Sequence, residues 1–209
     1  IDELLVSGDS LRAGMQIADS VNAAKAKLIY LVFEEFEKQL AGVAERNHWT
    51  REKKSNWYEY KEQADEFFYK WNTTYPGINY IVNDAQMPDG KQLWFRVEVE
   101  HRLFAGFCVF DPNAESEEGH GDQVDEYDAA TVKAVGHYLN ISVEDHNDWW
   151  ATWWYLPAGE QKPNDSVPNF KIMNDAAIAL ADKECRSEFV SLCVRNIEEM
   201  VERVLAIPE

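Results

Sequence analysis

The stretch PDGKQLWFRVEVEH (88–101) holds the residues whose types and spacing could do chemistry. Asp89 follows a proline, and Glu98 comes nine residues later on a segment whose pattern predicts a strand. Two carboxylates at neighbouring strand ends can hold Mg²⁺, and a lysine two residues beyond the second can orient the water that cleaves a phosphodiester. Asp89 and Glu98 are therefore candidate metal ligands, with Glu100 as a third candidate catalytic carboxylate.

The same stretch also predicts a plain hairpin, which we favour. Glu100 stands where the lysine is needed, and a carboxylate cannot supply a cation. Alternation along a strand places five side chains on one face, as in a solvated or cross-strand-paired surface: Trp94, Arg96, Glu98, Glu100 and Arg102. Asp89 lies in Pro-Asp-Gly, a common turn sequence. We therefore expect no cofactor, with Mg²⁺ needed only if the nuclease alternative holds.

A group of tryptophans forms the second candidate site, since four of the eight lie within 149–154. If buried, they hold the sheet to its helices. If partly exposed, they form a flat stacking surface for a sugar, a base or a side chain of a partner. The candidate interaction residues are Trp149, Trp150, Trp153 and Trp154.

Histidine and cysteine positions indicate no further site. His101 alternates with the apolar residues of its strand and is expected to be a core histidine. The three cysteines, Cys108, Cys185 and Cys193, form no CxxC pair and are expected to be buried free thiols in a reducing cytosol. Neither a GxxxxGK[ST] nor a GxGxxG motif is present, so nucleotide chemistry by those routes is not indicated.

The net charge of −18 bears most on the choice of partner. A surface of that sign repels phosphate backbones, so direct nucleic-acid binding is disfavoured, and a basic protein partner or imitation of DNA remain open. Charged residues interrupt every apolar stretch, so no membrane span is expected. The chain begins at Ile1 without a secretion signal, so we expect a cytoplasmic protein and a fragment of a longer chain.

Helical periods recur at both ends of the chain, and strand patterns lie between them. Apolar spacing predicts a helix over 19–40, an aromatic helix from Trp57 to Trp71, and helices over 124–138, 173–181 and from Ser187 onward. Strands are predicted over 78–84, 91–103, 104–110 and 149–156. We therefore expect a single α+β domain over 1–209, with an antiparallel sheet of three to four strands packed by long N- and C-terminal helices.

A family resemblance comes from the succession YPGINYIV, LWFRVEVEHRLFAGFCVFD, WWYLP and FVSLCVRNIEEMVERVL. This succession resembles the carboxyl-terminal region of poorly characterised bacterial proteins of the PD-(D/E)xK nuclease superfamily, over roughly residues 20 to 205. The resemblance implies a nucleic-acid-processing or phage-defence context, in which a nuclease-like core precedes such a region. Only Asp89 and Glu98 can be matched to the nuclease motif.

Three functions follow as expectations. The first is a non-catalytic accessory or protein-interaction domain, whose partner is another protein or a neighbouring nuclease core. The second is a metal-dependent nuclease that uses Asp89, Glu98 and Glu100. The third is an acidic inhibitor that imitates DNA, with carboxylates spaced like duplex phosphates.

Overall fold

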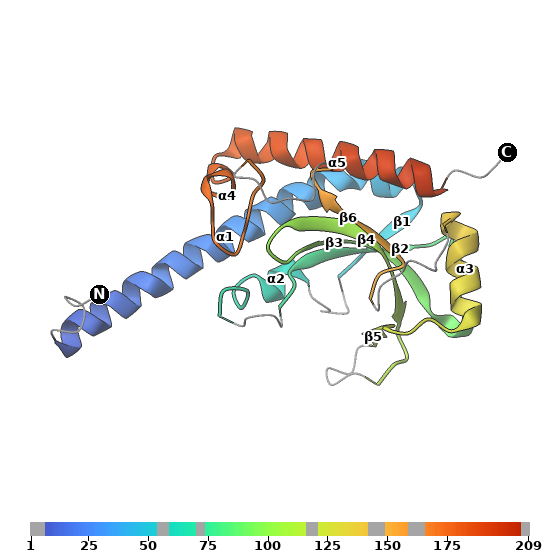
Figure 1. The fold of residues 1–209 in the computed structure, drawn as a ribbon, viewed down its shortest axis with the longest axis horizontal. Coiled ribbons are helices and arrows are strands. Elements are labelled where there is room, and N and C mark those ends of the chain that lie inside the picture. The colour runs from blue at the N-terminus through green and yellow to red at the C-terminus, as the bar shows by residue number, and fades with distance from the viewer. Residues whose placement is uncertain are drawn as a thin grey trace.

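A long first helix sets the shape of the molecule. The computed structural model describes residues 7–53, 59–69, 74–115, 121–141, 149–158 and 166–205. Helix α1 (Gly8–Arg46) has 39 residues and is capped by Ser7, whose hydroxyl accepts a hydrogen bond from the Ser10 amide. At 1.5 Å per residue it is about 58 Å long. Its buried residues all lie at or beyond Ala26, and its first half projects away from the rest of the molecule (Figure 1).

The described strands form one antiparallel sheet of six strands. In sheet order they are β1 (Trp49–Glu52), β2 (Gly77–Val82), β3 (Gln92–Val99) and β4 (Leu103–Asp111). Strand β4 then pairs along its other side with two short strands, β5 (Asp122–Gln123) near its end and β6 (Thr152–Leu156) near its start. The hairpin of β3 and β4 thus forms the middle of the sheet.

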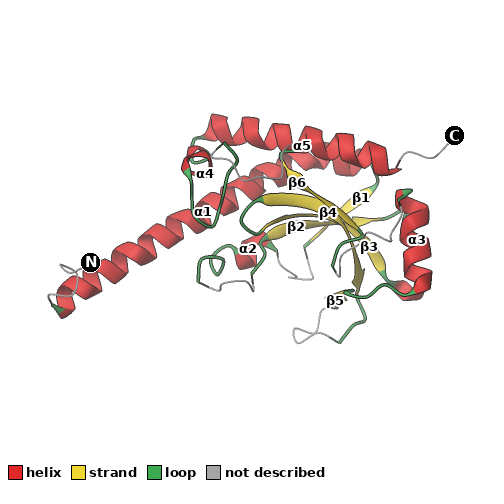
Figure 2. Ribbon diagram, in the orientation of Figure 1, coloured by secondary structure: helices red, strands yellow, loops and turns green. Residues whose placement is uncertain are grey.

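The register sorts the strand residues into two faces, because side chains alternate across a strand. Phe95 is paired with Tyr80 on one side and Phe107 on the other, and this face packs against helices α1 and α5 (Lys183–Leu205). The two helices lie across the sheet as one layer (Figure 2). The other face carries Arg96, which is paired with Asn79 and Gly106.

The main core fills the space between the helices and the first face of the sheet. Each fully buried aliphatic or aromatic side chain there contributes roughly 1.5–3 kcal/mol relative to exposure. Trp49 of β1 stacks on Phe95 with ring centroids 4.6 Å apart, which fixes the edge strand to the centre of the sheet. Almost fully buried helix residues include Ile29, Val32, Phe33, Phe36 and Leu40 of α1 and Val190, Cys193, Ile197 and Val201 of α5.

Shorter elements close the ends of the sheet. They are α2 (Tyr60–Gln63), the 3-10 turn η2 (Pro88–Gly90), α3 (Ala129–Leu139) and α4 (Asp175–Ala179). Asp128 caps α3, because its carboxylate accepts a hydrogen bond of 2.7 Å from the Thr131 amide. The same carboxylate accepts a hydrogen bond of 2.9 Å from Lys91 Nζ. The hydrogen bond from Lys91 is the main reason that the pKa of Asp128 falls to about 2.

The predicted α+β class, with an antiparallel sheet and long helices at both ends, is confirmed. The sheet has two strands that were not predicted. Strand β1 is a four-residue edge strand with the polar sequence Thr-Arg-Glu after Trp49, so it lacks the apolar alternation that marks a strand. Strand β5 has two residues, which is too short for any pattern.

Several boundaries differ from the prediction for local reasons. Helix α1 is capped by Ser7, begins at Gly8 rather than near 19, and continues through Gly42 to Arg46. The aromatic helix is reduced to α2, and Trp57 and Trp71 lie outside the described residues. Cys185 is exposed, whereas Cys108 and Cys193 are buried free thiols as expected. Within the described ranges, no helix has the length and apolar character to cross a membrane.

The cap of α3 gives a pH-dependent prediction. The pKa of Asp128 in the folded state lies below its ordinary value of 3.8, so the ionised carboxylate stabilises the fold above about pH 4. That contribution is lost as the pH falls through about 2. In Asp128→Asn the amide oxygen can still cap the helix, but the charge that faces Lys91 is gone.

We therefore expect the free energy of unfolding of Asp128→Asn to lie below that of the wild type at pH 5, and the difference to shrink as the pH approaches 2. Urea denaturation at a series of pH values measures this difference. A difference that stays constant over the whole series would contradict the assigned role of Lys91.

Candidate functional site

The structure places Asp89 and Glu98 at opposite ends of β3. Asp89 lies in η2, has a side chain 79% exposed and forms an ion pair of 3.8 Å with Lys91. Glu98 is near the far end of the strand, and about 20 Å of extended chain separates it from Gln92 at the strand start. The two carboxylates are therefore not brought to one position.

Glu100 is also engaged elsewhere. It lies in the turn between β3 and β4, where its carboxylate is 3.3 Å from Nδ1 of His101. In the described part of the chain, no three His, Cys, Asp or Glu side chains are grouped so that they could hold a metal ion.

Arg96 is the centre of a buried polar cluster on the second face of the sheet. Its guanidinium is 0% exposed, and Nε donates a hydrogen bond of 2.5 Å to Oε2 of Glu98. Nη1 donates to Oδ1 of Asn79 on the neighbouring strand, and Nη2 donates to the Tyr75 carbonyl at 2.6 Å. Planar donors on three nitrogens thus meet three acceptors, which is the condition for burying a guanidinium.

Gly77 makes room for this guanidinium. A Cβ at Gly77 would lie 2.7 Å from Nη2 and 2.8 Å from Cζ of Arg96, and 2.6 Å from the Val97 carbonyl. Any side chain at this position would therefore push the guanidinium away from the Tyr75 carbonyl. The sequence indicated a turn at Gly77, but in the structure the residue belongs to β2 and its lack of a side chain serves Arg96.

A second ionic group joins the edge strand β1 to α1. Nη2 of Arg51 donates to both carboxylate oxygens of Glu59, at 2.7 and 2.9 Å, which makes a charge-assisted pair. Nε of Arg51 also lies 3.7 Å from Glu37 of α1, and Lys53 forms a further ion pair with Glu37. Tyr60 donates a hydrogen bond of 3.1 Å to the same carboxylate. These residues tie the edge of the sheet to the long helix.

Burial shifts the pKa values of the acids in both groups. Desolvation raises the pKa of Glu98, while the charge of Arg96 and its hydrogen bond oppose that rise. The pKa of Glu59 is raised for the same reason, and Arg51 opposes it. Strongly shifted carboxylates in a cleft are candidates for catalysis. Here each one is directly bonded to an arginine, which is the arrangement of structural ion pairs.

The sequence left two alternatives for this face of β3, a solvated face or a cross-strand-paired one, and the face is not solvated. Arg96 and Arg102 are buried, at 0% and 2% exposure, and Glu98 is 7% exposed. The cross-strand pairing is present, since Arg96 bonds to Asn79. His101 was expected in the core, but its side chain is 38% exposed, because the turn over 100–102 ends the strand alternation.

Arg102 lies at the end of the same face. Its guanidinium carbon is 4.5 Å from the ring centroid of Tyr155, a cation–π contact. Its buried Nε and Nη1 atoms make no hydrogen bond with the residues that the structure describes. The aromatic face is therefore the described group that stabilises this cation.

The four tryptophans divide into two pairs. Trp150 is 7% exposed and Trp154 packs against the main core, whereas Trp149 and Trp153 are 49% and 40% exposed. Trp153 makes edge contacts with Tyr155 at 5.0 Å and with Phe104 at 6.0 Å. The predicted alternatives of core packing and exposed surface are thus both present. We give the name aromatic patch to the contacting rings of Phe104, Trp153 and Tyr155, together with the exposed Trp149, which lies four residues before Trp153 in the chain.

The aromatic patch rests on a rigid base beneath it. Trp150 contacts Phe104 at 5.3 Å in an edge geometry and belongs to a small buried cluster with Trp94, Cys108 and Phe110. Trp94 and Phe110 are stacked with ring centroids 4.0 Å apart. Because these rings are packed, the exposed rings of the patch are already ordered. Binding a partner therefore costs them little further side-chain entropy.

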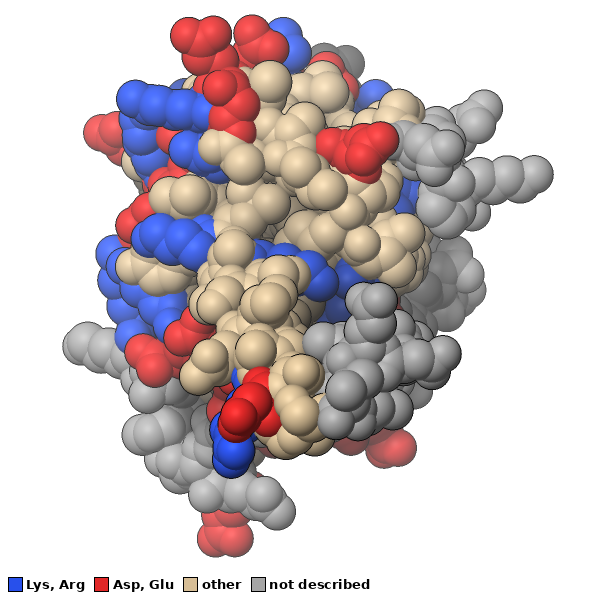
Figure 3. All heavy atoms as spheres, turned by 90° about the vertical axis from the view of Figure 1, so that its left-hand side faces the viewer, with Lys and Arg blue, Asp and Glu red and all other residues tan. Residues whose placement is uncertain are grey.

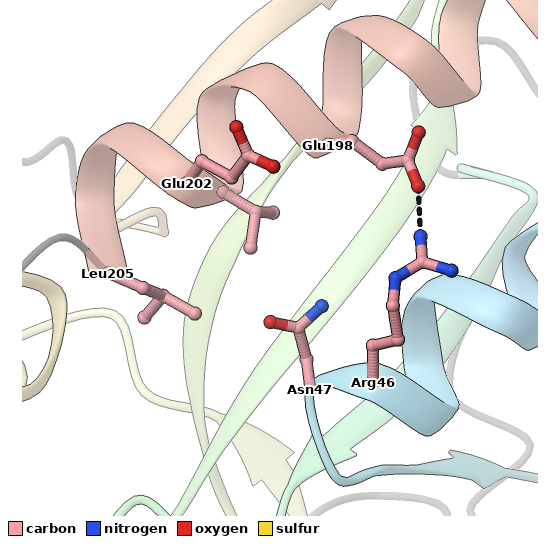
Figure 4. Close-up of a pocket in the computed structure, with 6 residues that line it drawn as sticks. Arg46, Asn47, Glu198, Glu202 and Leu205 are labelled. Carbon is pink, nitrogen blue, oxygen red and sulfur yellow. Dashed lines mark hydrogen bonds and ion pairs between the residues drawn. The ribbon is translucent and has the colours of Figure 1, made fainter.

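A surface hollow lies between the end of α1 and α5, away from these groups. Its lining includes Arg46, Asn47, Glu202 and Leu205, and Arg46 forms an ion pair with Glu198 across it (Figure 4). Glu198 neutralises Arg46, and the other polar groups that line the hollow are the carboxylate of Glu202 and the amide of Asn47. The hollow therefore has neither a nucleophile with a base nor a convergent set of donors.

Sequence reasoning missed Asn79, Gly77, Glu59 and Arg51 as members of the polar clusters. One signal was available, because Arg96 and Glu98 stand in a strand whose other residues from Leu93 onward are apolar on both faces. A charged pair in such a central strand must be buried and paired. A comparison of the chain with family models, with curated proteins and with solved structures finds no match.

The Arg96 cluster gives a stability prediction. Arg96→Met removes the donor to Glu98, Asn79 and the Tyr75 carbonyl, and leaves the Glu98 carboxylate buried without its cation. We expect the free energy of unfolding to fall by about 3–5 kcal/mol. Adding Glu98→Leu removes the stranded charge, so we expect the double variant to be more stable than Arg96→Met alone.

Urea denaturation of the two single variants and the double variant gives the coupling energy between the two charges. Losses that simply add would show that Arg96 and Glu98 do not stabilise each other.

Gly106 gives a prediction for the base of the aromatic patch. A Cβ there would meet the Thr152 carbonyl and would lie 2.8 Å from both Cε3 of Trp150 and Cα of Trp153. We expect Gly106→Ala to lower the free energy of unfolding by roughly 1–3 kcal/mol and to shift tryptophan emission to the red.

Gly42→Ala is the matched control. A Cβ at Gly42 meets only the flexible end of Arg46 at 3.4 Å, and alanine favours a helix interior by about 1 kcal/mol over glycine. This variant should unfold at an equal or higher urea concentration. Equal stability of both variants would contradict the close approach of β6 to Gly106.

Proposed function

We propose that this chain is a non-catalytic accessory domain that binds a protein partner through the aromatic patch. The observation that carries the proposal is the exposure of Trp149 and Trp153, at 49% and 40%, with Trp153 in contact with Phe104, which packs on the buried aromatic cluster. Tryptophan and tyrosine are the residues most enriched where a few side chains supply most of the binding energy.

The position of the patch on β6 supports a peptide-binding mode. Among the described strands, β6 pairs with β4 alone, so no other strand uses its second edge. An extended segment of a partner can add to such an edge by backbone hydrogen bonds, while Trp153 contacts its side chains.

The charge of the chain supports a protein partner with a basic surface. A net charge of −18 attracts a basic protein from a distance and raises its rate of association, but it repels a polyanion. A neighbouring nuclease core, which must carry basic residues to bind nucleic acid, fits this requirement. The resemblance to nuclease-superfamily proteins favours such a core as the partner, in a nucleic-acid-processing or phage-defence context.

The nuclease and DNA-mimic functions are the alternatives. The nuclease requires Asp89 and Glu98 to act together across the length of β3, and Glu98 to be released from Arg96. The mimic shares the acidic charge of the accessory domain, but it does not use exposed tryptophans.

The experiment is affinity capture from cells that express the chain, with three baits: the wild type, Trp149→Ala/Trp153→Ala and Leu192→Ala. Leu192 is 39% exposed on α5 and serves as the matched apolar control. We expect a protein that the wild type and the control enrich and that the tryptophan variant recovers at least about tenfold less, since two interface tryptophans contribute several kcal/mol.

Equal enrichment by all three baits would sink the assignment to the aromatic patch. Plasmid cleavage in Mg²⁺ or Mn²⁺ that Glu98→Gln abolishes would instead establish the nuclease alternative. Displacement of a captured basic protein from DNA by the wild type and by the tryptophan variant alike would favour the mimic.

A further inference from the structure

The face of α1 that packs on the core continues into the half of the helix that projects. The buried positions Ala26, Ile29, Phe33, Phe36 and Leu40 follow one another at steps of three and four. The same steps, followed toward the N-terminus, reach Asn22, Ala18, Met15 and Leu11. Leu11 and Met15 are 46% and 60% exposed, so the apolar stripe extends beyond the surface that covers it.

The projecting half gains little stability from the rest of the molecule. From Gly8 to Lys25 none of its residues is buried. A helix of this length without tertiary packing is marginal in water, and most helical stability in proteins comes from packing of an apolar face. A surface that covers Leu11 and Met15 would supply the missing stabilisation.

The body of the molecule has a matching surface at the same end. Ile172, just before α4, is 73% exposed, and Ile178, within α4, is 55% exposed. Helix α4 lies at the end of the body from which α1 projects (Figure 1). Seen from that end, uncharged atoms fill much of the middle of the view, and basic side chains gather along one side (Figure 3).

These two surfaces carry few charges. Residues 8–24 carry only Asp9, Arg12 and Asp19 as charged groups, and residues 166–182 carry only Lys171, Asp175 and Asp182. Each segment has a net charge of −1 from two acids and one base, so the repulsion between two chains of −18 is weak where these segments meet.

We infer that the chain forms a two-fold dimer in which the projecting half of each α1 packs its Leu11 and Met15 stripe on the α4 end of the other copy. A two-fold axis relates two identical contacts, because each copy supplies one helix and one receiving surface. The projecting helices are about 27 Å long and about 10 Å wide, so the two contacts bury on the order of 1,000 Å², near the lower limit for a stable interface.

The dimer goes beyond the proposed function and does not depend on it. The aromatic patch lies on β4, β6 and the residues just before β6, and the proposed contact of α1 with α4 uses neither Trp149 nor Trp153. Failure of one proposal therefore leaves the other intact.

Sedimentation velocity over a wide range of protein concentration tests the dimer. We expect the wild type to sediment as a dimer, and Leu11→Glu/Met15→Glu to raise the dissociation constant at least about tenfold. Ile178→Glu should weaken the dimer in the same way from the receiving side. Ile17→Glu is the matched control, because Ile17 is 64% exposed but lies about 200° around the helix from Met15.

Circular dichroism and urea denaturation verify that the variants keep the folded body, since the changed residues lie outside its core. A wild type that stays monomeric at every concentration overturns the inference. A dimer that Ile17→Glu breaks, and that Leu11→Glu/Met15→Glu leaves unchanged, overturns it as well.

Discussion

The buried guanidinium of Arg96 is the constraint on which the second face of the sheet depends. A cation at 0% exposure is tolerable only if its donors are matched, and here Glu98, Asn79 and the Tyr75 carbonyl match them. The match requires β2 to lie beside β3 in one register and requires a glycine at 77. The same bond occupies the carboxylate of Glu98, which is the residue that a metal site at this position would need.

The two faces of the sheet therefore have different tasks. The face that packs on α1 and α5 is apolar and supplies the main core. The other face combines the Arg96 cluster with stacked aromatic rings, and Phe104 packs on these rings and contacts the exposed Trp153. A rigid, acidic scaffold that exposes tryptophans at a sheet edge is suited to binding a basic protein, and this is the basis of the proposed function.

An element of the fold could be predicted when its sequence pattern lies within one segment of the chain. Strand β3 followed from alternation around Arg96 and Glu98, although the predicted strand ran on to 103, past the turn over 100–102. Helix α5 followed from its helical period, since that pattern also lies within one segment. Strand β1 was missed because its Thr50, Arg51 and Glu52 are polar, and its place in the sheet is set by Trp49 stacking on the distant Phe95. The burial of Arg96 was missed for a similar reason, because residues that cover the second face come from segments far along the chain.

The central claim is that Glu98 is a structural partner of Arg96 and not a ligand for a metal. Calorimetric titration of the wild type and of Glu98→Gln with Mg²⁺ and with Mn²⁺ tests it most directly. We expect the two proteins to give the same heats, because the carboxylate that differs between them is already bonded to a guanidinium. Saturable binding to the wild type that Glu98→Gln abolishes would contradict the account.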